Sequence, residues 1–113
     1  MSGVPISANS DRIAAVARLR KEHSEAAFPK RLTYDDVAGV EMVMLDADIM
    51  GCVTGWQDSD GNLEDWRWNI LAAREHDLER VLPKLSGQEA AYYQELLDMA
   101  VLILGSPDDR SRG

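Results

Sequence analysis

The sequence predicts an all-α protein: a compact four-helix domain with a central two-sided apolar helix at about residues 39–57. Apolar residues recur every three or four positions in four separate segments, which is the period of an amphipathic helix. Short stretches rich in Gly, Pro, Asp and Asn separate these segments, and short connections favour antiparallel packing of neighbouring helices. The chain has 113 residues, 45% of them hydrophobic, which is enough for one domain with a single core.

The first helix is expected at residues 10–28, after a flexible N-terminus at residues 1–9. Ser10 can act as its N-cap, and Asp11 suits the first turn because a carboxylate there interacts favourably with the helix dipole. Pro29 ends the helix, since the residue before a proline is disfavoured in the helical conformation.

Residues 39–57 are predicted to form a helix rather than a strand. Strand alternation would place Asp46 and Asp48 on the same face as the apolar residues. In a helix, a first apolar stripe contains Met42, Leu45, Ile49, Cys52, Val53 and Trp56. A second apolar patch contains Val43, Ala47 and Met50. The helix is therefore expected to be buried on two sides, with Gly51 and Gly55 where another helix comes close.

The third helix is expected at residues 63–83, after an Asp- and Asn-rich turn at residues 58–62. Its broad apolar face includes Trp66, whereas Trp68 falls off that face. Pro83 closes the helix or lies just beyond its last turn.

The last helix follows a capping box formed by Ser86 and Glu89, whose side chains can satisfy unpaired amides of the first turn. Gly105 is a typical end signal. We therefore expect a single helical domain at residues 10–104 and a disordered tail at residues 105–113.

Charge is divided unevenly along the chain, whose formal net charge is -8. Residues 1–31 hold six Lys or Arg and three acids, a net charge of +3, and residues 32–113 hold six Lys or Arg and seventeen acids, a net charge of -11. This balance argues against a nucleic-acid or membrane binder, because such affinity comes from cationic side chains. It suggests instead that the basic segment lies on the acidic body of its own chain or of a second subunit, as in a homodimer.

The sequence is that expected of a cytoplasmic protein. Cys52 is its one cysteine, so an intramolecular disulfide is impossible. The longest apolar run, at residues 99–104, is far shorter than the roughly 20 residues that span a bilayer. Residues 1–9 have neither the basic nor the apolar region of a signal peptide.

The strongest candidate site combines the two acids of the 39–57 helix with two arginines of the next helix. Asp46 and Asp48 lie in an apolar helix, and Arg67 and Arg74 fall on the apolar face of its neighbour. One interpretation is a buried ion-pair network that fixes the register of the two helices. The other is a polar pocket that binds a small charged ligand.

Two aromatic residues are candidates for a partner surface. Trp68 falls outside the predicted core face, and Tyr93 follows another tyrosine, so that only one of the two is expected to be fully buried. The alternative is that both cover another part of the same bundle.

Other chemistry finds little support. The turn at residues 58–62 resembles the start of a calcium-binding loop, but Leu63 and Asn69 stand where such a loop needs a glycine and a bidentate glutamate. His76 is expected to be solvated, and Cys52 to be an inert, packed thiol. We therefore predict no catalytic residues, no metal and no cofactor, and a non-enzymatic role is favoured.

One group of residues carries a resemblance to known proteins. It consists of residues 43–48, residues 51–53, Trp56, Leu63, Arg67, Leu82, Pro83, Tyr92 and Tyr93. With these residues, the stretch 28–104 resembles a set of small uncharacterised helical proteins of actinobacteria. No activity is assigned to that set, so the resemblance implies no site residues.

The favoured hypothesis is a small acidic helical protein that acts as a homodimeric protein-interaction or accessory module, without nucleic-acid or membrane binding. The alternative is a small-molecule binding protein or enzyme that uses the Asp/Arg pocket of the helix core. A metal-dependent protein at the 58–62 turn is a third hypothesis.

Overall fold

The structure is a computed structural model that describes the backbone of residues 4–105 and the side chains of residues 10–105. This part of the chain forms four α-helices and two short 3-10 helices, and it contains no strand beyond one isolated bridge between Val37 and Val40. The elements are α1 (Val4–Glu25), η1 (Lys30–Thr33), α2 (Met42–Asp58), α3 (Asp65–Val81), η2 (Leu82–Lys84) and α4 (Gly87–Leu104). The predicted all-α, four-helix domain is confirmed.

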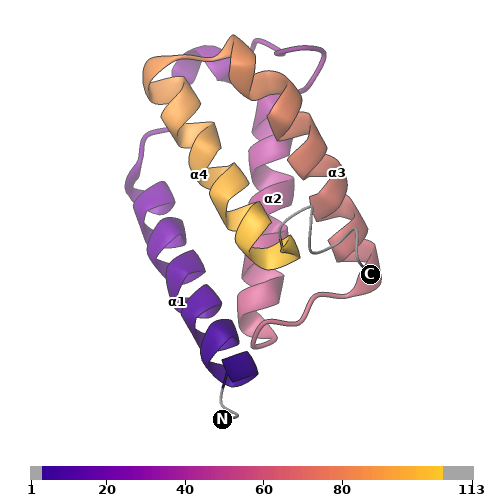
Figure 1. The fold of residues 1–113 in the computed structure, drawn as a ribbon. Helices are drawn as coiled ribbons and strands as arrows, with labels where there is room; N and C mark the ends of the chain where they lie inside the picture. The colour runs from indigo at the N-terminus through magenta and orange to yellow at the C-terminus, as the bar shows by residue number, and fades with distance from the viewer. Residues whose placement is uncertain (1–3, 106–113) are drawn as a thin grey trace.

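Successive helices run in opposite directions, as the short connections predict (Figure 1). α4 packs against all three other helices, and α1 packs mainly against α4, with only a small contact to α2. α2 packs chiefly against α3 and α4, so α2 and α4 share the centre of the domain. Within the described residues, none of the helices is long and apolar enough to cross a membrane.

α2 is a helix, as predicted, but it is buried on one side only. All six residues of the first predicted stripe are buried. In the second patch, Val43 and Ala47 are exposed and Met50 is half-buried. The reason is that α1, which would have to cover this side, lies on α4 instead. An additional N-cap was not predicted: the Glu41 carboxylate accepts hydrogen bonds from the amides of the next turn.

The two glycines of α2 differ in their surroundings. A Cβ atom at Gly51 would meet no other atom, so the prediction that a helix comes close there is wrong. At Gly55 a Cβ atom would collide with the guanidinium of Arg67 from α3. The close neighbour at Gly55 is thus the end of a flexible side chain rather than a helix backbone.

α1 begins earlier than predicted and is anchored on the far end of α4. Because the helix starts at Val4, Ser10 lies inside it and is not its N-cap. Arg12 donates from Nε and Nη2 to the backbone oxygens of Leu102 and Ile103, both at 2.8 Å. The Arg12 guanidinium also lies 5.7 Å from the ring centre of Trp56. These bonds satisfy carbonyls that the end of a helix otherwise leaves unpaired.

α3 presents a different face to the core from the one predicted. Trp66 is 56% exposed, whereas Trp68 is half-buried and packs against the core. Glu75, only 5% exposed, lies on the buried face with Leu71 and Leu78. Because the charged Glu75 lies on the buried face, the apolar residues of the sequence indicate a face rotated away from the true one. The prediction therefore placed Trp66 in the core and Trp68 outside it, whereas the structure shows the reverse.

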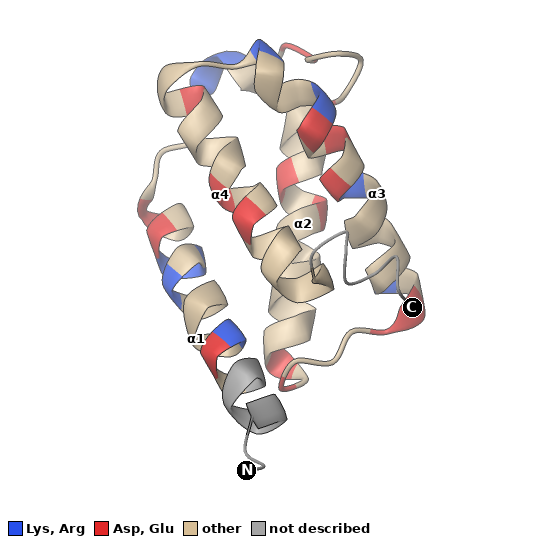
Figure 2. Ribbon diagram, viewed as in Figure 1, with Lys and Arg blue, Asp and Glu red and all other residues tan. Residues whose placement is uncertain are grey.

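α4 begins directly after Ser86, as predicted, but without the predicted capping box. The Ser86 side chain makes no capping hydrogen bond. The Glu89 carboxylate instead accepts two hydrogen bonds from Arg31, from Nε at 2.9 Å and from Nη2 at 2.7 Å. With Arg12, this contact places two arginines of the basic segment on the body of the same chain. Figure 2 marks Lys and Arg positions in blue along α1 and Asp and Glu positions in red along α4, which packs against it.

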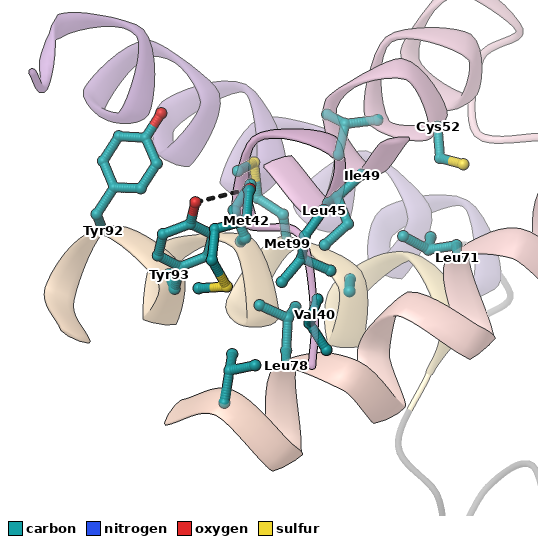
Figure 3. Packing of buried hydrophobic residues seen from close by; sticks show 14 of the residues in the cluster. Val40, Met42, Leu45, Ile49, Cys52, Leu71, Leu78, Tyr92, Tyr93 and Met99 are labelled. Atoms are coloured by element: carbon teal, nitrogen blue, oxygen red, sulfur yellow. Dashed lines mark hydrogen bonds between the residues drawn. The ribbon is translucent and has the colours of Figure 1, made fainter. Parts of the chain in front are cut away.

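The core lies between α2, α3 and α4 and is closed at one end by Tyr93. The Tyr93 ring is fully buried, and its hydroxyl donates to the backbone oxygen of Met42 at 2.8 Å (Figure 3). Residues 106–113, for which a disordered tail was predicted, lie outside the described residues, and residues 4–9 of the predicted flexible N-terminus belong to α1.

Candidate functional site

The predicted four-residue network is divided between two sides of α2. Asp46 and Asp48 are two positions apart, so their side chains leave the helix in nearly opposite directions. Asp46 contacts residues of α1 and α4, and Asp48 contacts α3. The single polar pocket expected from Asp46, Asp48, Arg67 and Arg74 is therefore not formed.

Asp48 and Arg74 form the predicted ion pair between α2 and α3. Arg74 donates from Nε at 2.9 Å and from Nη2 at 2.6 Å to the same Asp48 oxygen, and from Nη1 to Asp77 at 3.0 Å. The pair is not deeply buried, since the two side chains are 27% and 30% exposed. Burial disfavours the charged guanidinium, but the hydrogen bonds to both carboxylates outweigh this effect and raise the pKa of Arg74. The arrangement links α2 to α3, and all three nitrogens of the Arg74 guanidinium donate to carboxylates.

Arg67 forms an ion pair with Glu64 and with neither of the two aspartates. Its guanidinium lies 5.0 Å from the ring centre of Trp66, and its Nε is 3.5 Å from a carboxylate oxygen of Glu64. A shallow recess of about 200 Å³ opens beside it between α2 and α3. Its lining consists of Ala47, Asp48, Gly51, Cys52, Trp66, Arg67 and Ile70.

Cys52 has the environment of a structural thiol. The residue is buried, and its Sγ lies 3.6 Å from the backbone oxygen of Arg67, to which the thiol can donate. Burial raises the pKa of the Cys52 thiol and so disfavours the reactive thiolate.

A second polar cluster, which was not predicted, joins α1, α2 and α4. His23 is only 4% exposed, and its Nε2 lies 3.1 Å from Asp46 Oδ1. The Tyr92 hydroxyl donates to the other Asp46 oxygen at 2.7 Å, and the His23 and Tyr92 rings pack with their centres 4.1 Å apart and their planes tilted by 44°. On the opposite edge of the imidazole, Nδ1 is 3.4 Å from a carboxylate oxygen of Glu95. We call His23, Asp46, Tyr92 and Glu95 the histidine cluster.

The surroundings of the histidine cluster change the pKa of Tyr92. Burial, followed by its hydrogen bond to the Asp46 carboxylate, raises the pKa of Tyr92 far above the usual value for tyrosine. Its hydroxyl therefore remains a proton donor to Asp46 over the whole physiological range of pH.

The sequence contained one signal for His23. Val16 and His23 are both buried and are seven positions apart, so the histidine continues the buried stripe of α1. A hydropathy pattern does not predict burial for a polar residue such as His23, even where it falls on the apolar stripe of a helix. His76, by contrast, is exposed, as predicted.

Beside the histidine cluster lies an open groove of about 470 Å³ between the end of α1 and α4. The α1 side contributes Glu22, Ala26 and Ala27, and the α4 side contributes Gln88, Ala91, Tyr92 and Glu95. The groove therefore combines small apolar residues with two carboxylates, and Tyr92 and Glu95 belong to both the groove and the cluster.

The aromatic partner surface predicted from Trp68 and Tyr93 is not formed. Tyr93 is fully buried and hydrogen-bonded in the core, and Trp68 packs against the core from α3. The exposed tryptophan is Trp66, one helical turn before the exposed Ile70.

In the described part of the chain, we find no group of three or more His, Cys, Asp or Glu arranged to hold a metal ion. Comparisons of the whole sequence with protein-family models and with curated proteins, and of the fold with solved structures, find no match. The resemblance to small actinobacterial proteins therefore stays a prediction.

Proposed function

We propose that the protein is a small interaction module that forms a homodimer through one face of α2 and α3. We call this the α2–α3 face and define it by Ala47, Gly51, Trp66 and Ile70, which line the recess between the two helices. The exposure of Trp66, at 56%, is the observation that carries the proposal. Large aromatic side chains are costly to expose and are enriched among residues that dominate protein interfaces.

The shape of the α2–α3 face supports a second copy of the chain as the partner. Trp66 lines the recess of about 200 Å³ together with the small residues Ala47 and Gly51. A two-fold axis through this face would place the Trp66 of each copy over the recess of the other. Such self-complementarity of one surface is what a symmetric dimer requires.

The charge distribution also favours this face for self-association. Two copies of a chain with a net charge of -8 repel each other over most of their surface. On the α2–α3 face, Asp48 is paired with Arg74, and Arg67 lies beside Glu64. These pairs partly compensate the local charges, which reduces repulsion between two copies at this face.

The proposal is tested by measuring the dimer dissociation constant by sedimentation equilibrium. Trp66→Ala is expected to weaken the dimer at least about tenfold, which is the usual effect of removing an interface tryptophan. Tyr34→Ala is the matched control, because Tyr34 is an aromatic residue that is 90% exposed and lies outside the α2–α3 face. A wild-type chain that stays monomeric at all accessible concentrations, or equal effects of the two substitutions, would contradict the proposal.

A further inference from the structure

The histidine cluster contains one buried nitrogen that makes no hydrogen bond, Nδ1 of His23. An ionised carboxylate only accepts hydrogen bonds, so Asp46 needs the proton of His23 on Nε2 and the proton of the Tyr92 hydroxyl. On the opposite edge of the imidazole, Nδ1 lies 3.4 Å from a carboxylate oxygen of Glu95 and is a buried atom without a hydrogen bond in the described structure. The Glu95 carboxylate, which lines the groove, therefore receives no hydrogen bond from the imidazole.

The groove beside this position has the composition of a site for an organic cation. Its walls carry the carboxylates of Glu22 and Glu95, and none of its lining residues is Lys or Arg. The remaining wall is formed mainly by the methyl groups of three alanines and by Tyr92. Its volume of about 470 Å³ lies in the range of small-molecule sites, roughly 300–1,000 Å³.

We propose that this groove binds a small primary amine in its ammonium form, with a short hydrocarbon chain. The ammonium group donates to the carboxylates of Glu95 and Glu22, which line opposite sides of the groove, and so supplies the hydrogen bond that Glu95 does not receive from His23. The hydrocarbon chain lies against the alanines and the Tyr92 ring. This site is on the opposite side of α2 from Asp48 and does not depend on the proposed dimer.

The test uses butylamine as the probe and butan-1-ol as its neutral counterpart of the same length. The uniformly ¹⁵N-labelled full chain is titrated with each compound at low ionic strength, and amide chemical shifts are recorded by NMR. Butylammonium is expected to shift the amides of Glu22, Ala27, Ala91 and Glu95, with a dissociation constant on the order of millimolar for so small a ligand. Butan-1-ol is expected to leave these amides nearly unchanged.

Substitutions separate a local site from the general attraction of an acidic protein for cations. Glu95→Gln keeps the shape of the side chain and is expected to weaken butylammonium binding about tenfold, because one charge-assisted contact is lost. Glu79→Gln makes the same change in net charge on α3, where Glu79 is exposed, and is expected to change binding less than about twofold. If Glu95→Gln fails to fold, Glu22→Gln replaces it, since Glu22 is exposed on α1.

Three results would overturn the proposal. These are equal shifts with butan-1-ol, equal weakening by the Glu95 and Glu79 substitutions, and unchanged amides at tenfold the expected dissociation constant. Because the α2–α3 face is remote from the groove residues, the Trp66→Ala variant should bind butylammonium as the wild type does. Failure of the dimer proposal would therefore leave this result intact.

Discussion

His23 Nε2 lies 3.1 Å from Asp46 Oδ1, and this contact joins α1 to α2 at the point where the Tyr92 hydroxyl from α4 reaches the same carboxylate. α1 makes few contacts with α2, and the histidine is one of its polar links to the centre of the domain. The others are the hydrogen bond from Arg20 to Gln57 of α2 and those from Arg12 to the end of α4. The proposed amine site lies beside this link, in the groove that Tyr92 and Glu95 line.

Replacement of His23 by alanine is expected to destabilise the fold by about 2–4 kcal/mol. The substitution leaves a cavity in the interface between α1 and α4 and removes one of the two hydrogen bonds to Asp46. Urea unfolding measures the free energy of unfolding. His76→Ala is the control, because His76 is exposed and its loss should change stability by less than about 0.5 kcal/mol. Similar effects at the two histidines would show that the histidine cluster contributes nothing to stability.

The two consecutive tyrosines of α4 predict loss of stability in alkaline solution. Burial raises the pKa of Tyr92 and of Tyr93 well above the value of about 10 found in unfolded chains. Above pH 10 the unfolded chain releases these protons while the folded chain keeps them, so stability is complete below pH 10 and falls as the pH rises further. Unfolding by urea at pH 8 and pH 11 measures this loss.

Tyr93→Phe is the informative variant for the alkaline transition. At pH 8 it loses the hydrogen bond to the Met42 backbone oxygen and should be destabilised by about 1 kcal/mol. Its stability should also fall less steeply between pH 8 and pH 11 than that of the wild type, because one buried hydroxyl is absent. An unchanged slope would indicate that Tyr93 does not contribute to the alkaline transition.

The sequence was sufficient to predict the four helices because each carries an apolar stripe at the helical period and is bounded by turn residues. It also predicted that the acids of α2 pair with arginines of α3, since an acid in an apolar helix needs a partner on its neighbour, and Asp48 does pair with Arg74. It failed for Trp66 because Glu75 occupies a buried position on α3. A hydropathy pattern treats such a charge as a marker of the exposed face, so the buried face that it predicts for α3 is rotated about the helix axis.

The histidine cluster could not be predicted because its members come from three helices that are distant in the sequence. The sequence pattern predicts a partner for Asp46 on the next helix, α3, but its partners His23 and Tyr92 lie on α1 and α4. Which helices flank a given side chain is decided by how α1 crosses the bundle, and this is a property of packing over the whole domain. No local spacing in the sequence encodes it.

The Arg12 contact predicts that the end of α4 depends on α1. Arg12→Ala removes two hydrogen bonds to the last carbonyls of α4 and the contact with Trp56, and should cost about 2–3 kcal/mol. Arg12→Lys keeps the charge but not the paired donors, and should recover only part of this stability. Arg18→Ala is the control, because Arg18 is an exposed arginine of the same helix. Thermal unfolding of the three variants would contradict the prediction if all three were alike.

The buried thiol of Cys52 reports on the opening of the contact between α2 and α3. Because burial raises its pKa and hides its sulfur, the reaction with a disulfide reagent at pH 8 should be on the order of 100-fold slower in the folded chain than in urea. Arg74→Met removes the ion pair with Asp48 one helical turn away, and should accelerate the reaction by allowing α3 to separate from α2 more often. Arg80→Met, which removes an exposed arginine at the end of the same helix, should leave the rate close to that of the wild type. A folded-state rate equal to that in urea would instead mean that Cys52 is accessible, and that the contact between α2 and α3 is open in solution.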